Sequence, residues 1–145
     1  MKDLKRYNKG ISIINREKFL KIISIVNKFY EVDCLQNSRI TSIVEPRQIA
    51  TYYTHKLTDL STTSVGLLFN KTHATVLSSI SVIEGRILFD KEFKKQIPKL
   101  EELIFRINFK TEDEFLLFKA KEEINELMSK MTLNQCNELI ENIKN

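Results

Sequence analysis

The sequence is poor in the residues that interrupt helices: of 145 residues, three are glycine and two are proline, and tryptophan is absent. Glycine and proline are the strongest local breakers of regular structure, so their scarcity favours long helical segments. Leucine, isoleucine, lysine and glutamate are frequent instead, and 42% of the residues are hydrophobic while 29% are charged. This balance excludes an intrinsically disordered chain and predicts an all-α fold.

Cysteine and long apolar runs are scarce as well. Cys34 and Cys136 form no CxxC pair and lie near no histidine at metal-ligand spacing. We therefore expect two free, buried or half-buried thiols in a reducing compartment, and no metal site. No apolar run reaches the roughly 18 residues that cross a bilayer, and the basic N-terminus lacks the apolar stretch of a secretory signal. These absences predict a cytoplasmic protein without a membrane partner.

Positive charge is in slight excess and is unevenly distributed. The formal net charge is +4 and the pI is about 9.0. Residues 1–33 carry eight basic and four acidic side chains, residues 34–97 carry eight and five, and residues 98–145 carry seven and ten. The first two-thirds of the chain therefore favour a polyanionic partner, whereas the acidic last third is a poor candidate for phosphate contacts.

The residue patterns of common active sites are missing. The sequence has no HExxH motif, no nucleophile elbow, no paired-carboxylate motif and no Cys–His pair with a third residue to orient it. Residues 66–72, GLLFNKT, differ from a phosphate-binding P-loop because they lack the glycine before Lys71 and are one residue short. We predict that the protein is not an enzyme and needs no cofactor.

Apolar residues recur with the i, i+3, i+4, i+7 spacing of one helix face. Asn15, Thr72 and Asp90 are the expected N-caps, and we expect Pro46 and Pro98 in the first turns of their helices, where the missing N–H is harmless. Together these signals predict helices over residues 16–30, 46–60, 62–69, 73–88, 90–97, 98–108, 112–130 and 133–143.

The last third of the chain has further start signals. Capping boxes at 111–114 and 132–135 mark the beginnings of the final two helices. We divide the chain into a basic N-terminal arm over residues 1–15, a DNA-binding domain over 16–97, and a C-terminal appendage of amphipathic helices over 98–145.

A group of short motifs between residues 46 and 77 is the most specific feature of the chain. In order, they are PRQIA at 46–50, LTDLS at 57–61, Gly66, Phe69 and HATVL at 73–77. In sequence and spacing they resemble the C-terminal DNA-binding domain of the bacterial replication initiator DnaA, and the similarity covers about residues 19–97. The resemblance implies an all-helical helix-turn-helix domain that reads the major groove of duplex DNA, while one loop arginine enters the adjacent minor groove.

The resemblance also implies roles for individual residues. Arg39 falls at the position of the family's minor-groove arginine, and Arg47 matches a second basic position. His73 matches the family histidine that packs on base edges, and Thr75 matches a family threonine that contacts bases or phosphate. Arg47, Lys71, Ser61 and Thr62 are expected to hold phosphates. The complete set of expected DNA-binding residues is Arg39, Arg47, Ser61, Thr62, Lys71, Thr72, His73, Ala74 and Thr75.

The chain departs from the family pattern at several of these positions. Thr72 replaces an acidic residue, Ala74 replaces a threonine, and Ser78 and Val82 replace a histidine and a lysine. The turn before the recognition helix is one residue shorter, and the family's basic loop is reduced to Arg39. Fewer cations predict a shallower dependence of affinity on salt, and the lost acidic group removes an acceptor for cytosine. We therefore expect a target sequence different from that of the initiator.

These observations predict a non-enzymatic regulator of transcription or replication that binds double-stranded DNA sequence-specifically, with dimerisation through the appendage as a further expectation. About 18 residues precede the region of resemblance, so the initiator's ATPase domain is not expected in this chain. The alternative is a protein–protein adaptor with a vestigial helix-turn-helix that works through its acidic C-terminal helices.

Overall fold

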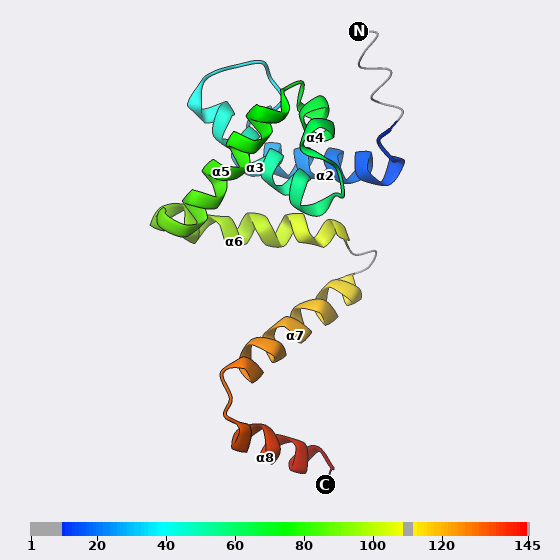
Figure 1. Cartoon of the computed structure of the whole chain (residues 1–145), viewed down its shortest axis with the longest axis vertical. Helices are drawn as coiled ribbons and strands as arrows, with labels where there is room; N and C mark the ends of the chain where they lie inside the picture. Colours follow the sequence, from blue (N-terminus) through cyan, green and yellow to red (C-terminus); the bar gives the residue numbers. More distant parts are fainter. Residues whose placement is uncertain (1–9, 109–111, 145) are drawn as a thin grey trace. The chain divides into compact units, whose positions relative to one another are not determined.

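The computed structural model describes residues 10–108 and 112–144 of the chain. Within these ranges all regular secondary structure is helical, which confirms the predicted all-α fold (Figure 1). The elements are α2 (Ile13–Tyr30), α3 (Thr41–Leu57), α4 (Thr62–Phe69), α5 (His73–Phe89), α6 (Lys91–Phe105), the short 3₁₀ helix η1 (Arg106–Asn108), α7 (Glu112–Ser129) and α8 (Leu133–Lys144).

The chain divides into two compact units, Met1–Ile107 and Asn108–Asn145. In the first unit, α3 packs against α2, α4 and α5, and α6 packs against α2 and α5. Their apolar faces meet in one core, in which the Phe19 and Phe69 rings make an edge-to-face contact at 5.2 Å. The fully buried side chains at its centre include Ile22, Val26, Ile49, Tyr53, Val65, Val76, Ile83, Leu100 and Ile104.

The first described helix begins earlier than predicted. Ser12, not Asn15, is the N-cap of α2, because its hydroxyl accepts a hydrogen bond from the Asn15 N–H at 3.2 Å. The Asn15 side chain instead donates to the Asp59 carboxylate at 2.6 Å. The helix therefore extends into the predicted basic arm, of which residues 1–9 lie outside the described part.

The helix predicted to start at Pro46 also begins earlier. The helix α3 starts at Thr41, so Pro46 lies in its second turn rather than its first. The backbone N–H groups of Ile43 and Val44 both bond to the Ile40 carbonyl at 2.9 Å, which forms the first turn before the proline is reached. Pro46 then removes one helical hydrogen bond without ending the helix, because its buried side chain packs inside the unit.

The prediction that a helix starts at Pro98 is wrong. The structure has one continuous helix, α6, from Lys91 to Phe105, and Pro98 lies inside it. Its buried residues, Phe93, Ile97, Leu100 and Ile104, form a single stripe that passes the proline on the opposite side. Pro98 itself is exposed. The domain division predicted between residues 97 and 98 falls within this helix.

The second unit contains α7 and α8. The predicted capping box at 132–135 is present: the Thr132 hydroxyl accepts from the Gln135 N–H at 3.3 Å, and the Gln135 side chain accepts from the Thr132 N–H at 2.9 Å. The other predicted capping box starts at Thr111, which lies outside the described residues. Among residues 113–144, Phe115 is the only buried side chain. The two helices thus expose most of their apolar residues.

Candidate nucleic-acid interface

The helices α4 and α5 are joined by a tight turn of Asn70, Lys71 and Thr72. Asn70 adopts a left-handed conformation (φ 54°), and its N–H bonds to the Leu67 carbonyl at 3.2 Å. The Lys71 N–H bonds to the Gly66 carbonyl at 2.7 Å. This pair of bonds is the Schellman arrangement that ends a helix. It confirms the predicted turn and fixes the direction in which α5 leaves α4.

Gly66 allows this turn to pack closely. A Cβ atom at this position would lie 2.5 Å from the Lys71 carbonyl oxygen and 3.3 Å from the Thr72 carbonyl carbon. Both neighbours are backbone atoms, which cannot move without moving the turn itself. The glycine of the resemblance therefore has a steric reason in this chain: only a residue without Cβ lets the turn fold back against α4.

The N-terminus of α5 is capped as predicted. The Thr72 hydroxyl accepts from the Thr75 N–H at 3.3 Å, and the two threonine hydroxyls lie 3.2 Å apart. His73, Ala74 and Thr75 are all exposed. Lys71, Thr72 and Thr75 line a shallow depression together with Gly66. The structure thus gathers the predicted residues 71–75 on one solvent-facing surface, where the first helical turn presents N–H groups and the positive end of the helix dipole.

Ser61 and Thr62 lie at the other end of the motif. The Ser61 hydroxyl accepts from the Ser64 N–H at 3.2 Å and is the N-cap of α4. Ser61 is exposed, and Thr62, the first residue of the helix, is half-buried. Their hydroxyl and backbone groups therefore lie at a helix N-terminus, a place that suits a phosphate oxygen.

Arg47 holds the loop between α2 and α3, a role that the sequence did not reveal. Its side chain points at the loop between α2 and α3, where Nε donates to the Cys34 carbonyl at 2.9 Å and Nη2 donates to the Gln36 carbonyl and, at 3.0 Å, to the Ser38 carbonyl. Three donations to one loop make Arg47 a positioning residue. In the sequence, the only indication that Arg47 has a role was its place near the start of the PRQIA motif.

The same loop is also tied to α2. The Asn27 side chain accepts from the Cys34 N–H at 2.8 Å, and the Cys34 thiol is fully buried. Arg39 follows directly after the anchored segment and is exposed. The arginine predicted to enter the groove thus lies on a loop that two helices hold in place. Asn27 is the second residue that holds this loop, and no sequence motif indicates its role.

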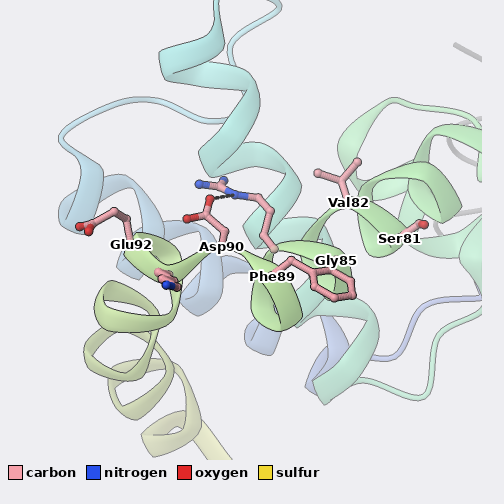
Figure 2. Close-up of a pocket in the computed structure, with 8 residues that line it drawn as sticks. Ser81, Val82, Gly85, Phe89, Asp90 and Glu92 are labelled. Atoms are coloured by element: carbon pink, nitrogen blue, oxygen red, sulfur yellow. Dashed lines mark hydrogen bonds and ion pairs between the residues drawn. The ribbon is translucent and has the colours of Figure 1, made fainter.

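The outward face of α5 continues beyond its first turn. Leu77 and Val82 are 52% and 40% exposed, and Ser78 and Ser81 are exposed as well. The helix ends in a corner where the Arg86 guanidinium lies 4.2 Å from the centre of the Phe93 ring and 3.4 Å from the Asp90 carboxylate. Figure 2 shows this corner beside a shallow pocket lined by Val82, Gly85 and Phe89. Arg86 lines the same pocket and is partly exposed there.

No group of three or more potential metal ligands occurs within residues 10–108 and 112–144. Among the helices of the described ranges, none combines the length and apolarity required to cross a bilayer. Cys34 and Cys136 are both free, and they are buried and half-buried respectively, as predicted.

Two helices joined by a three-residue turn, the second with its N-terminal side chains exposed, define a helix-turn-helix domain. In this domain, residues 20–83 match the family model described as the bacterial dnaA protein helix-turn-helix. No solved structure gave a significant match to the chain.

Curated relatives agree with this assignment. The chain is 33% identical over 87 residues to the chromosomal replication initiator protein DnaA of Bacteroides thetaiotaomicron, which covers 57% of the chain and 18% of that protein. It is 36% identical over 98 residues to that of Caldanaerobacter subterraneus subsp. tengcongensis (65% and 22%), and 37% over 103 residues to that of Wolbachia sp. subsp. Brugia malayi (70% and 22%). The chain therefore spans about a fifth of the length of these relatives.

Proposed function

We propose that the protein binds double-stranded DNA sequence-specifically and acts as a non-enzymatic regulator of replication or transcription. The observation that carries this proposal is the exposed N-terminus of α5 in a DnaA-type helix-turn-helix. Lys71, Thr72, His73 and Thr75 lie there together, on a turn whose geometry is fixed by Gly66 and Asn70. A recognition helix presents such N-terminal residues to base edges in the major groove.

Three kinds of contact are expected in the complex. His73, Ala74 and Thr75 face the bases, with Thr72 beside them at the helix start. Lys71, Ser61 and Thr62 contact the phosphate backbone, which fixes register without reading sequence. Arg39 enters the minor groove from its anchored loop. Arg47, predicted from the sequence to hold phosphate, contributes here by holding that loop.

Selection of bound duplexes from a randomised DNA pool tests the proposal, and the affinities of the selected duplexes are then measured across a salt series. An enriched motif with affinity that falls as salt rises is the expected result. In Lys71→Gln the slope of log K against log salt should decrease by about 1, because one phosphate contact is lost. Lys95→Gln is the matched control, since Lys95 is exposed on α6 and faces Glu92 at 3.6 Å. A pool without enrichment would refute sequence-specific binding.

The exposed surfaces of α7 and α8 favour a second candidate function, that of a protein–protein adaptor. The described residues of α7 and α8 expose large apolar side chains, among them Leu127 at 64% and Ile143 at 76%. Acidic side chains accompany them on the same helices. Exposed apolar surface beside charge is typical of a protein–protein contact. This candidate is the adaptor, in which the acidic helices bind a partner protein.

Self-association through the same surfaces is a separate proposal. Light scattering at high micromolar concentration separates a homodimer from a monomer. If a dimer forms, Leu139→Glu and Ile140→Glu should dissociate it, because both residues are about half exposed in the single chain. A monomer at that concentration would remove dimerisation and leave the adaptor.

A further inference from the structure

A second, more enclosed pocket lies where α2, α3, α5 and α6 meet. Its volume is about 230 Å³, and residues from the end of α2, the first turns of α3, the last turn of α5 and the first turns of α6 line it. A water molecule takes about 30 Å³ in the liquid, so this space equals that of about seven to eight waters. Sites for drug-sized ligands are larger, at roughly 300–1,000 Å³. A ligand of this pocket is therefore about as large as a small amino acid.

Arg86 presents free hydrogen-bond donors at the wall of this pocket. Its Nε atom pairs with the Asp90 carboxylate at 3.4 Å, and its guanidinium lies 4.2 Å from the centre of the Phe93 ring. These two contacts hold the side chain in place. The two Nη atoms donate no hydrogen bond to any residue that the structure describes. Paired N–H donors on a fixed guanidinium suit a carboxylate, which accepts two hydrogen bonds from them.

The start of α3 supplies the opposite charge. Glu45 lines the pocket and forms no ion pair within residues 10–108 and 112–144. Ser42, about one turn earlier, lines it as well, and Pro46 has no N–H to donate to the Ser42 carbonyl. The proline thus leaves a backbone acceptor without its usual helical partner, next to the carboxylate. An ammonium group, which has three N–H donors, suits both acceptors.

Tyr30 is close to both of these charges. Burial is the main cause that raises the pKa of Tyr30, while Arg86 lowers this pKa and Glu45 raises it. Arg86 and Glu45 nevertheless form no ion pair with each other in the described structure, so the pocket keeps a positive and a negative group apart. Val32 and Ile49 add apolar surface between them. The pocket therefore offers a cation, an anion and an apolar wall to one small molecule.

We propose that this pocket binds a free α-amino acid with a small apolar side chain. The ligand carboxylate lies on the Nη atoms of Arg86, its ammonium group lies against Glu45 and the Ser42 carbonyl, and its side chain packs on Val32 and Ile49. A simple anion such as phosphate would satisfy Arg86 but would face the Glu45 carboxylate. A simple amine would leave Arg86 unpaired. The inference goes beyond the proposed DNA binding and does not depend on it.

Isothermal titration calorimetry of the intact chain with alanine, valine, leucine and isoleucine tests the proposal. At least one of them should bind at millimolar concentration or below. The amide of that amino acid lacks the carboxylate and its deaminated acid lacks the ammonium group, so each should bind about tenfold more weakly. If none of the four amino acids bound, the proposal would be overturned. It would also be wrong if phosphate or the deaminated acid bound as tightly as the amino acid, because the pocket would then be a site for simple anions.

Variants on the two walls identify the contacts. Glu45→Gln changes an exposed residue, so the fold should be retained; it should weaken the amino acid about tenfold without weakening the deaminated acid. Arg86→Lys keeps the charge but loses the paired donors, so it should weaken both ligands. Glu84→Gln is the matched control, since Glu84 is exposed on α5 and does not line the pocket.

Thermal unfolding shows whether the variants keep the fold. If Arg86→Lys is destabilised, because its contacts with Asp90 and Phe93 are disturbed, Glu45→Gln with the two ligands still decides the question. An affinity for the amino acid that is the same in Glu45→Gln as in Glu84→Gln would mean that the ammonium group is not held at α3, and the proposal would fail.

Discussion

The Lys71 carbonyl oxygen lies 2.5 Å from the place that a Cβ atom would take on Gly66. This relationship ties the last turn of α4 to the residue that precedes the cap of α5. The Lys71 N–H also bonds to the Gly66 carbonyl at 2.7 Å. The position of α5 therefore depends on the absence of a side chain at one residue.

Gly66→Ala should destabilise the protein by about 1–2 kcal/mol. The added methyl forces the turn away from α4, a cost of overpacking that exceeds the gain in helix propensity. Chemical denaturation measures the difference. Gly85→Ala is the matched control: its Cβ is unobstructed, so it should stabilise by up to about 1 kcal/mol. Equal effects of the two substitutions would contradict the steric argument.

Arg47→Lys should loosen the loop between α2 and α3. Lysine cannot reproduce the fork that reaches the Cys34, Gln36 and Ser38 carbonyls, so a loss of about 1–2 kcal/mol in stability is expected. Hydrogen exchange of the amides of residues 34–38 should become faster, whereas amides in α6 should keep their relative protection. Unchanged exchange in the loop would show that other contacts hold it.

Arg39→Ala should weaken DNA binding without changing stability. Arg39 is exposed, so the thermal stability should stay the same. Affinity for the selected duplex should fall about ten- to hundredfold, because a charge-assisted contact in the groove is lost. Fluorescence anisotropy at constant salt measures the change. A variant that binds as tightly as the parent would remove the minor-groove contact from the proposal.

The Asp90 carboxylate predicts a pH effect at the start of α6. The backbone N–H of Phe93, 3.1 Å away, lowers the pKa of Asp90, and the Arg86 side chain acts in the same direction. A lowered pKa means that the contribution to stability is present above the unfolded value of 3.8 and is lost as pH falls through the lower folded value. Stability should therefore fall more steeply below pH 4 in the parent than in Asp90→Asn, which caps without titrating. If the stability of the parent and of Asp90→Asn fell in parallel with pH, the Asp90 carboxylate would not be the cause.

The two cysteines should differ in reactivity. Burial raises the pKa of the Cys34 thiol to about 11, and the thiol is fully enclosed, whereas Cys136 is half-buried. Because the thiolate is the reactive form, iodoacetamide at pH 8 should modify Cys136 in the native protein and leave Cys34 intact. Mass spectrometry of the native and denatured protein checks this. In Arg47→Lys, Cys34 should become labelled as well, since its loop is no longer held.

The sequence predicted those features that local chemistry determines. Thr72 and Asp90 each have a hydroxyl or carboxylate before an apolar stripe, and each is an N-cap as predicted. Ser61 caps α4 in the same way, although it was not among the predicted caps. The starts of α2 and α3 were harder to place, since Ser12 lies before two exposed isoleucines and Ile40 provides no side-chain cap. In the same way, a proline in the sequence predicts a helix start. In the structure, however, the buried stripe from Phe93 to Ile104 stabilises one helix that continues through Pro98.

The candidate site shows the same division. Residues 71–75 are contiguous, so one turn and one cap brought them together as predicted. The contacts of Arg47 with the loop cross 9 to 13 residues of sequence, and no local pattern reveals such a pairing. The difference between Gly66 and Gly85 was equally hidden, because it depends on which backbone lies opposite each one.

The anchoring of the loop at residues 33–39 has a thermodynamic consequence. A recognition segment that folds only on contact with DNA loses conformational entropy at that moment and shows a large negative change in heat capacity. Here Asn27 and Arg47 order the segment in the free protein. The heat capacity change of binding should therefore match the surface buried between rigid partners, and the association rate should depend on charge and collision rather than on a slow ordering step.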